Sequence, residues 1–228
     1  MVRGLYIAAS GMLAELTRQQ QIANDLANAS TPGYKADRST QRSFAELLLA
    51  NQRTGLPVGG LGLGVEIDSV VTDLRPGPIR DTGEPLDLAI VGEGWFGVNT
   101  PQGVRYTRNG QFTVSPQGTL VTAEGYEVLS RTGGPVRVTA DGNVDVRDVG
   151  VFAVPNATKL GDNLYAGDAA GQATGRVRAG ALEGSGVNPA RSMVDLIASF
   201  RTYEAGQRVI RTIDDSLERA ANRVGAIG

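Results

Sequence analysis

The chain has 228 residues, of which 41% are apolar, and this is enough to bury one large hydrophobic core or two smaller ones. Its 22 basic and 24 acidic residues give a net charge of −2, so charge indicates no nucleic-acid or membrane-surface partner. The sequence contains no cysteine and no histidine. This excludes thiolate and disulfide chemistry and removes the commonest zinc ligands and general bases, which disfavours an enzyme.

The first segment has the pattern of an amphipathic helix. Apolar or small residues recur at alternating steps of three and four, with Gln19 as a polar interruption; they are Leu5, Ala9, Met12, Leu16, Ala23 and Leu26. A stripe this narrow cannot be buried by one helix alone, so we expect a partner helix. No run of about 18 apolar residues predicts a membrane span, and no signal-peptide pattern is evident, so we expect no membrane insertion.

Carboxamides recur every four residues on another face of the same helix, at Gln20, Asn24 and Asn28. A carboxamide both donates and accepts hydrogen bonds, so such a row suits a helix packed among other helices. A solvated face explains the row equally well.

The helix is expected to end at Thr31-Pro32-Gly33-Tyr34. Proline disfavours helical geometry in the residue before it, and glycine supplies the positive φ that the next turn position needs. The turn should lead Tyr34 into an extended arm, toward either the β domain or a neighbouring subunit. We expect residues 35–55 to be an extended, partly helical linker, with a helical turn or two in "FAELLLANQ" (44–52).

The centre of the chain, residues 56–182, predicts an antiparallel all-β domain. Short β-branched or aromatic runs occur at 86–91, 94–98, 111–114, 119–122, 126–129, 136–139 and 143–146. Dipeptides typical of tight turns separate them: Asn109-Gly110, Gln117-Gly118, Glu124-Gly125, Gly133-Gly134 and Asp141-Gly142.

The last segment carries a second heptad stripe, with Gln207 as its interruption. Its members are Leu196, Phe200, Tyr203, Ile210, Ile213, Leu217, Ala220 and Val224. The simplest mate for each stripe is the other, so we predict an α+β fold in which helices in 1–34 and 190–228 pair as a coiled coil and enclose the β domain, with 183–189 as the return linker. Two amphipathic helices lying on the β domain are the alternative.

Two motifs suggest chemistry, and each lacks a required part. Gly92 to Gly97 matches G-x-G-x-x-G, but a proline and turn residues follow it instead of a helix, so a hairpin with Trp95 or Phe96 in the core explains it better. Asp141, Asn143 and Asp145 have the spacing that begins an EF-hand loop, but the glycine and final glutamate are missing. We therefore expect no catalytic, cofactor-binding or metal site, although scattered carboxylates leave a glycosidase open.

Four blocks resemble the bacterial flagellar basal-body rod and hook proteins. They are "ANDLANASTPGYKADR" (23–38), "LDLAIVGEGWFGV" (86–98), "YTRNGQFTVSPQGTLVTAEGYEVL" (106–129) and "LEGSGVNPARSMVDLIASFRTYEAGQRVIRTID" (182–214), in the family's order. The length and "GWFGV" are most similar to proximal-rod members, and distal-rod members are the close alternative.

The resemblance implies a structural, non-enzymatic subunit of the basal-body rod. Its two terminal helices would form an inner tube with those of other copies and of other rod and hook proteins, and its β domain an outer layer. It further implies export through the flagellar channel by the type III apparatus and transmission of torque from motor to hook. A monomeric ligand- or carbohydrate-binding β module with helical ends is the alternative.

Overall fold

The computed structural model of the protein describes residues 2–43, 47–50, 57–61, 64–139 and 141–225. These form two compact units. Unit 1 contains Met1–Leu26, Asp37–Val71 and Pro189–Gly228, and unit 2 contains Ala27–Ala36 and Thr72–Asn188. The chain therefore passes between the units at 26/27, 36/37, 71/72 and 188/189.

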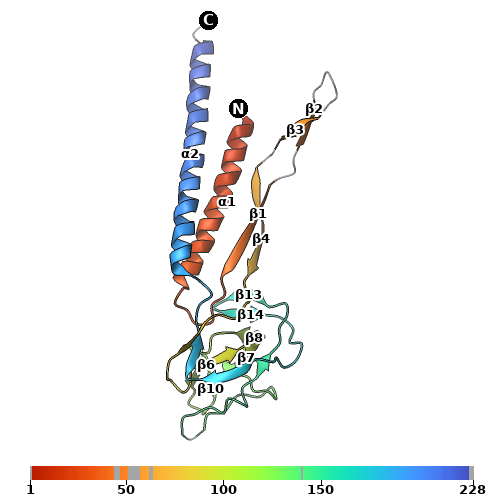
Figure 1. Cartoon of the computed structure of the whole chain (residues 1–228), viewed down its shortest axis with the longest axis vertical. Helices are drawn as coiled ribbons and strands as arrows, with labels where there is room; N and C mark the ends of the chain where they lie inside the picture. The colour runs from red at the N-terminus through yellow and green to blue at the C-terminus, as the bar shows by residue number, and fades with distance from the viewer. Residues whose placement is uncertain (1, 44–46, 51–56, 62–63, 140, 226–228) are drawn as a thin grey trace. The chain divides into compact units, whose positions relative to one another are not determined.

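Unit 1 is built from two long helices and a β ribbon. Helices α1 (Val2–Ala27) and α2 (Pro189–Gly225) run side by side in opposite directions (Figure 1). Strand β1 (Asp37–Ser43) pairs with β4 (Val65–Thr72), and β2 (Leu47–Ala50) pairs antiparallel with β3 (Pro57–Leu61). Helix α2 begins with a proline after Asn188, an arrangement that suits a helix start because the first turn needs no intrahelical N–H donor there.

The described part of segment 44–52 is strand rather than helix. Leu47–Ala50 form β2 with a register of Leu47 opposite Leu61. The helical turn expected there is therefore wrong for these residues, since pairing with β3 satisfies their backbone groups. Residues 44–46, 51 and 52 lie outside the described residues.

Unit 2 is an antiparallel β domain. One sheet has the order β13-β14-β8-β7-β11-β10-β9, with β12 also paired to β7, while β15 pairs with β6 and β16 with β5. The strands are β5 (Ile79–Asp81), β6 (Leu88–Val91), β7 (Trp95–Thr100), β8 (Gly103–Thr107), β9 (Thr113–Val114), β10 (Leu120–Val121), β11 (Glu127–Val128), β12 (Val151–Phe152), β13 (Thr158–Gly161), β14 (Leu164–Ala166), β15 (Arg176–Ala179) and β16 (Ala181–Glu183).

Strand β7 is buried on both faces. Phe96 and Val98 belong to the main core, whose other members are Leu88, Ile90, Phe112, Leu120, Val128, Val136, Val144, Val149 and Val151. Trp95 points into a second cluster with Tyr106, Val154 and Tyr165. Successive side chains of a strand point to opposite faces, so a strand whose apolar side chains point to both faces fits between two cores.

The expected β runs are confirmed at β6, β7, β9, β10 and β11. Residues 136–139 and 143–146 take part only in isolated bridges, such as Val138 with Val144. Positive φ is confirmed at Gly118, Gly125, Gly133 and Gly142. The overall prediction of two terminal helices that pack together and a central antiparallel β domain is confirmed.

Two turn predictions are wrong in detail. Gly110 lacks positive φ and closes no hairpin; it is needed because a Cβ there would lie 1.5 Å from the carbonyl oxygen of Leu88. The Gly92 to Gly97 segment does not join a hairpin, since β6 pairs with β15 whereas β7 pairs with β8. Its glycines do allow close passage, because a Cβ on Gly94 would lie 2.4 Å from Val151 Cγ1.

Candidate assembly surface

The two terminal helices meet through small residues as well as apolar ones. A Cβ added at Gly206 would lie 2.7 Å from Met12 Cγ, and one at Gly4 would lie 3.4 Å from Ile213 Cδ1. Ser199 on α2 also contacts Glu15 on α1. The start of α1 therefore faces the middle of α2, and its later turns face the α2 N-terminal part, as antiparallel neighbours do.

The contact between α1 and α2 has a polar centre. Glu15, Gln19 and Ser199 are buried, with 8%, 8% and 1% of their surface exposed. The Ser199 hydroxyl donates to the Glu15 carboxylate at 2.5 Å. A Glu15 oxygen also lies 3.9 Å from the Arg18 guanidinium on the same helix. A buried polar pair of this kind contributes more to the register of a helix pair than to its stability.

The predicted stripe on α2 lies partly in this contact. Leu196, Tyr203, Ile210 and Ile213 are half-buried, whereas Phe200 and Leu217 are exposed. On α1, Ala9, Met12 and Leu26 are half-buried and Ala23 is exposed, and Leu5 and Leu16 are 36% and 40% exposed. Pairing of the helices is confirmed, while their coiled-coil character and the assembly role of these residues stay predictions.

Gln19, expected as the polar interruption of the α1 stripe, is buried in the contact, whereas Glu15, Ser199 and Gly206 were missed because an apolar heptad search passes over polar and glycine positions. Their spacing carried a usable signal. Ser199, Tyr203, Gly206, Ile210 and Ile213 follow steps of four, three, four and three.

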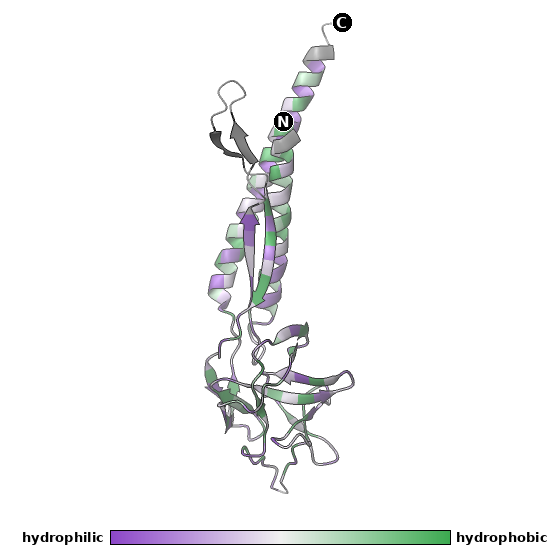
Figure 2. Ribbon diagram, turned by 90° about the vertical axis from the view of Figure 1, so that its right-hand side faces the viewer, coloured by the Kyte–Doolittle hydropathy of each residue, from purple (hydrophilic) through white to green (hydrophobic). Residues whose placement is uncertain are grey.

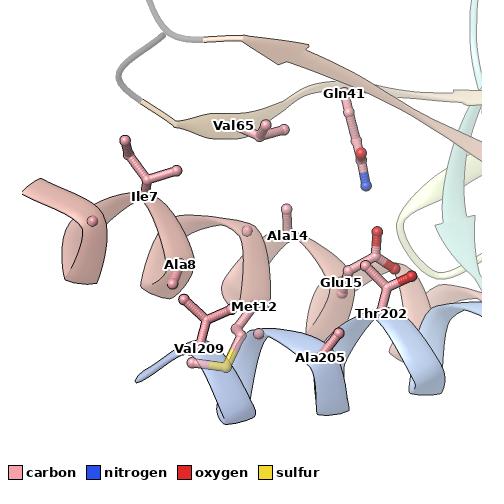
Figure 3. A pocket seen from close by; sticks show the side chains of 13 residues that line it. Ile7, Ala8, Met12, Ala14, Glu15, Gln41, Val65, Thr202, Ala205 and Val209 are labelled. Carbon is pink, nitrogen blue, oxygen red and sulfur yellow. The ribbon is translucent and has the colours of Figure 1, made fainter. Parts of the chain in front are cut away.

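A hollow of about 510 Å³ lies within unit 1 between both helices and the β1–β4 ribbon. Figure 3 shows Met12 and Val209 on its helix side, Val65 and Gln41 on the ribbon, and Glu15 with Thr202 toward one end. The remaining lining residues are Gly4, Ile7, Ala8, Gly11, Ala14, Ala205 and Gly206. Small residues on facing helices thus leave apolar space that the described residues do not fill.

Large apolar side chains remain exposed on both helices. On α1, Tyr6 and Leu13 are 72% and 66% exposed; on α2, Val194 and Ile197 are 65% and 55% exposed. Figure 2 shows apolar and polar residues interleaved along both helices. A folded chain rarely leaves this much apolar surface on its helices unless another surface covers it.

The expected carboxamide row is not gathered in the subunit. Gln20 and Asn24 are exposed, and Asn28 lies in unit 2, where its side-chain oxygen accepts a hydrogen bond from the Thr31 hydroxyl at 3.2 Å. Gln19 and Gln21 are the inward-facing amides, and Gln21 Nε2 donates to the Asp37 carbonyl. The row's role in assembly stays a prediction.

The turn at Thr31-Pro32-Gly33-Tyr34, called the signature turn below, belongs to unit 2. Pro32 is half-buried, its carbonyl accepts a hydrogen bond from Asn163 Nδ2 at 2.8 Å, and Gly33 has the expected positive φ of 67°. Tyr34 is 4% exposed, and the Lys159 ammonium lies 4.0 Å from the centre of its ring. Of the two destinations expected for the Tyr34 arm, the structure shows the β unit of the same chain.

The described residues offer no built site for a metal. No group of three His, Cys, Asp or Glu side chains gathers among them. Among the described residues, no helix is long and apolar enough to cross a membrane.

Three family models match the chain. The D1 domain of the flagellar hook protein FlgE/F/G matches residues 89–158, the C-terminal part of the flagellar basal body rod FlgEFG protein matches 178–223, and the flagella basal body rod protein model matches 5–35. These ranges lie in the sheet of unit 2, in β15 to α2, and in α1 with the signature turn.

Curated relatives match over nearly the whole chain. The flagellar basal-body rod protein FlgG of Agrobacterium fabrum is 33% identical, covering 94% of this chain and 96% of its own length. FlgG of Bacillus subtilis is 31% identical over 97% and 99%, and FlgF of Escherichia coli is 32% identical over 96% and 97%. Because these identities are so similar, they favour neither FlgF nor FlgG, and the proximal-rod assignment stays a prediction.

Proposed function

Since the chain belongs to the family of flagellar basal-body rod proteins, we propose that it is a structural subunit of the rod that polymerises through its terminal helices. It is a component of the basal body that associates with other rod and hook proteins, and it is not an enzyme. The alternative of a monomeric binding module has no support in these relatives.

The observation that carries the polymerisation is the exposed apolar surface of α1 and α2. Leu13 and Val194 expose about two thirds of their surface in the single subunit, 66% and 65%. Neighbouring copies would bury such side chains and fill the hollow beside α1. Subunits that repeat head to tail without closing produce a helical filament, which is the form that a drive-shaft needs.

Export by the flagellar type III apparatus and torque transmission from motor to hook are the finer parts of the proposal. The matches to basal-body rod proteins support both, because a rod subunit has to reach the growing axle and then carry load. Loss of secretion in a strain without the export apparatus would test the first part.

The test of polymerisation is complementation of a strain that lacks this gene. We expect Leu13→Asp and Val194→Asp to be produced at normal levels yet to be missing from purified basal bodies, with swimming abolished. The control is Leu160→Asp on β13 of unit 2, where Leu160 is similarly exposed at 56%. Normal swimming with both helix variants would contradict assembly through the helices.

A further inference from the structure

Three charged side chains are buried together in unit 2. Lys35, Glu183 and Arg108 have 1%, 1% and 2% of their surface exposed. Lys35 Nζ donates to Glu183 Oε1 at 2.6 Å, and Arg108 Nη1 donates to Glu183 Oε2 at 2.8 Å. One carboxylate therefore binds two cations that come from distant parts of the sequence.

Backbone groups complete this cluster. Lys35 Nζ also donates to the Arg75 carbonyl at 2.6 Å, and the Gly77 amide donates to Glu183 Oε1 at 2.8 Å. Arg108 Nη2 donates to the Gly92 carbonyl at 2.9 Å. The bonds are short and directional, so they fix the positions of the segments that supply them.

Three of the segments that supply these bonds lead into unit 1. Lys35 lies in the ten-residue piece Ala27–Ala36 between two crossings, Arg75 follows the crossing at 71/72, and Glu183 precedes the one at 188/189. Backbone bonds tie the same segments together: Gly33 N to Glu183 O at 2.8 Å, Gly186 N to Tyr34 O at 2.8 Å, and Asp73 N to Ala36 O at 2.9 Å. The three segments that carry the four connections are thus bonded to one another inside unit 2.

Stability alone does not explain such a cluster. Removing charges from water costs free energy, and apolar residues of similar volume often stabilise a core as well or better. Consistent with this cost, burial lowers the pKa of the Lys35 ammonium below its ordinary value, although the charge of Glu183 opposes the shift. What the charges add is geometry, because each bond has a defined direction and partner.

We propose that Lys35, Arg108 and Glu183 are positioning residues that clamp together the three chain segments of unit 2 that carry its four connections to the helices and ribbon of unit 1. In a rod subunit, load that enters through any one of these segments is then shared by the other two instead of stretching a single flexible linker. This mechanical role rests on the proposed function, while the clamp itself is a property of the isolated chain.

Hydrogen exchange of the full-length protein tests the clamp. In the wild type, the amides of Gly33 and Gly186 should be as protected as that of Leu129, which donates to the Gly97 carbonyl in the core. In Lys35→Met, both should exchange about tenfold faster or more, while the Leu129 amide and the melting temperature of unit 2 stay near wild type. Methionine keeps the side-chain length and leaves Glu183 paired with Arg108, so no buried charge is orphaned.

The matched control is Arg178→Met, which removes an exposed ion pair of unit 2, that between Arg178 and Asp81, with 2.6 Å between nitrogen and oxygen. Arg178→Met should leave the exchange rates of the Gly33 and Gly186 amides unchanged. Rapid exchange of Gly33 and Gly186 in the wild type, or unchanged exchange in Lys35→Met, would overturn the clamp. So would an equal loss of protection at Leu129, because the cluster would then be one part of a single cooperative core.

Swimming in media of increasing viscosity tests the mechanical role. Lys35→Met should enter basal bodies normally but lose swimming at a lower viscosity than the wild type or Arg178→Met. Equal swimming at every viscosity would refute load sharing while leaving the exchange result intact. Failure of the helix variants to block assembly would instead refute the proposed function, so the two failures are distinguishable.

Discussion

Gly33 is restricted by both its backbone conformation and its surroundings. Its φ of 67° disfavours any L side chain, and a Cβ there would lie 2.3 Å from the backbone carbon of Arg108 and 2.5 Å from the nitrogen of Asn109. A side chain at Gly33 should therefore destabilise the β unit as well as the turn. The turn is packed against the end of β8, inside unit 2.

We expect Gly33→Ala to lower the free energy of unfolding of unit 2 by more than the ~1–2 kcal/mol that positive φ alone costs. The control is Gly83→Ala, since Gly83 has a φ of 79° but nothing lies within 4 Å of its added Cβ. Chemical denaturation of both purified variants measures the difference, which reports the backbone clash. Equal losses would show that unit 2 accommodates the methyl group beside Arg108.

Tyr106 should make the β unit sensitive to alkaline pH. Burial, with a smaller effect of the Asp168 charge, raises the pKa of its phenol above the ordinary value of 10.0. The folded state then holds the proton to a higher pH than the unfolded chain, so the free energy of unfolding falls as the pH rises above about 10. The free energy of unfolding, measured by denaturation between about pH 8 and 11, should fall more steeply with pH for the wild type than for Tyr106→Phe. Parallel curves would contradict this assignment.

The sequence predicted the position and φ of the turn, because proline and glycine act locally. It left the destination of Tyr34 and Lys35 open, because their partners Lys159 and Glu183 are far away along the chain. Lysine, arginine and glutamate are usually exposed, so nothing in their spacing marks them as buried together.

At the scale of helices and strands, periodicity predicted the type of each element more reliably than it predicted which face of a helix is buried. Long helices and β-branched runs such as those of β6 and β7 were predictable from pattern and turn residues. Strands β12 and β16 were not predicted, because their two and three residues are too few to show a period and, unlike β9 to β11, they do not lie between successive predicted turns. The inner face of α1 was found only in part, because its buried residue Glu15 is charged and lies outside the apolar stripe.

Aspartate substitutions at Ile213 and Leu16, one from each predicted apolar stripe, should behave differently, because the two side chains lie in different environments. Ile213 packs near Gly4 in the contact between α1 and α2, whereas Leu16 is 40% exposed. We expect Ile213→Asp to disrupt both helix pairing and rod assembly. Leu16→Asp should disrupt assembly alone, since its carboxylate would be buried only by a neighbouring subunit.

Disulfide formation between Met12→Cys and Gly206→Cys can measure pairing, because the chain has no other cysteine. In the wild-type background and in Leu16→Asp, the cross-link should form at the same rate. In Ile213→Asp it should form at least several-fold more slowly. A slow cross-link in Leu16→Asp would place Leu16 in the intramolecular contact. Normal rod assembly of Leu16→Asp would refute a role of Leu16 at an interface between subunits.

At the scale of the whole molecule, the two units interleave in sequence. The expected boundaries placed the helices in 1–34 and 190–228 and the β domain in 56–182, whereas unit 2 combines Ala27–Ala36 with Thr72–Asn188. Composition separates helical ends from a glycine-rich centre, but it cannot show that a short piece near one end folds with the centre. That assignment depends on long-range bonds such as the one between Gly33 and Glu183.

This interleaving changes what protease should leave behind. If neighbouring subunits cover residues such as Tyr6 and Val194, as proposed, then in dilute solution we expect trypsin to cut first in Met1–Leu26, Asp37–Val71 and Pro189–Gly228. A peptide containing Ala27–Ala36 should stay bound to the Thr72–Asn188 core, because the bonds of Gly33 and Lys35 hold it there. Size exclusion followed by mass spectrometry should recover both pieces together.

The same digest of Lys35→Met should release the peptide, with Arg178→Met as the control that retains it. Helices that resist trypsin as long as the core does would show that unit 1 is stable without neighbours, and early loss of the wild-type peptide would show that Ala27–Ala36 does not fold with unit 2.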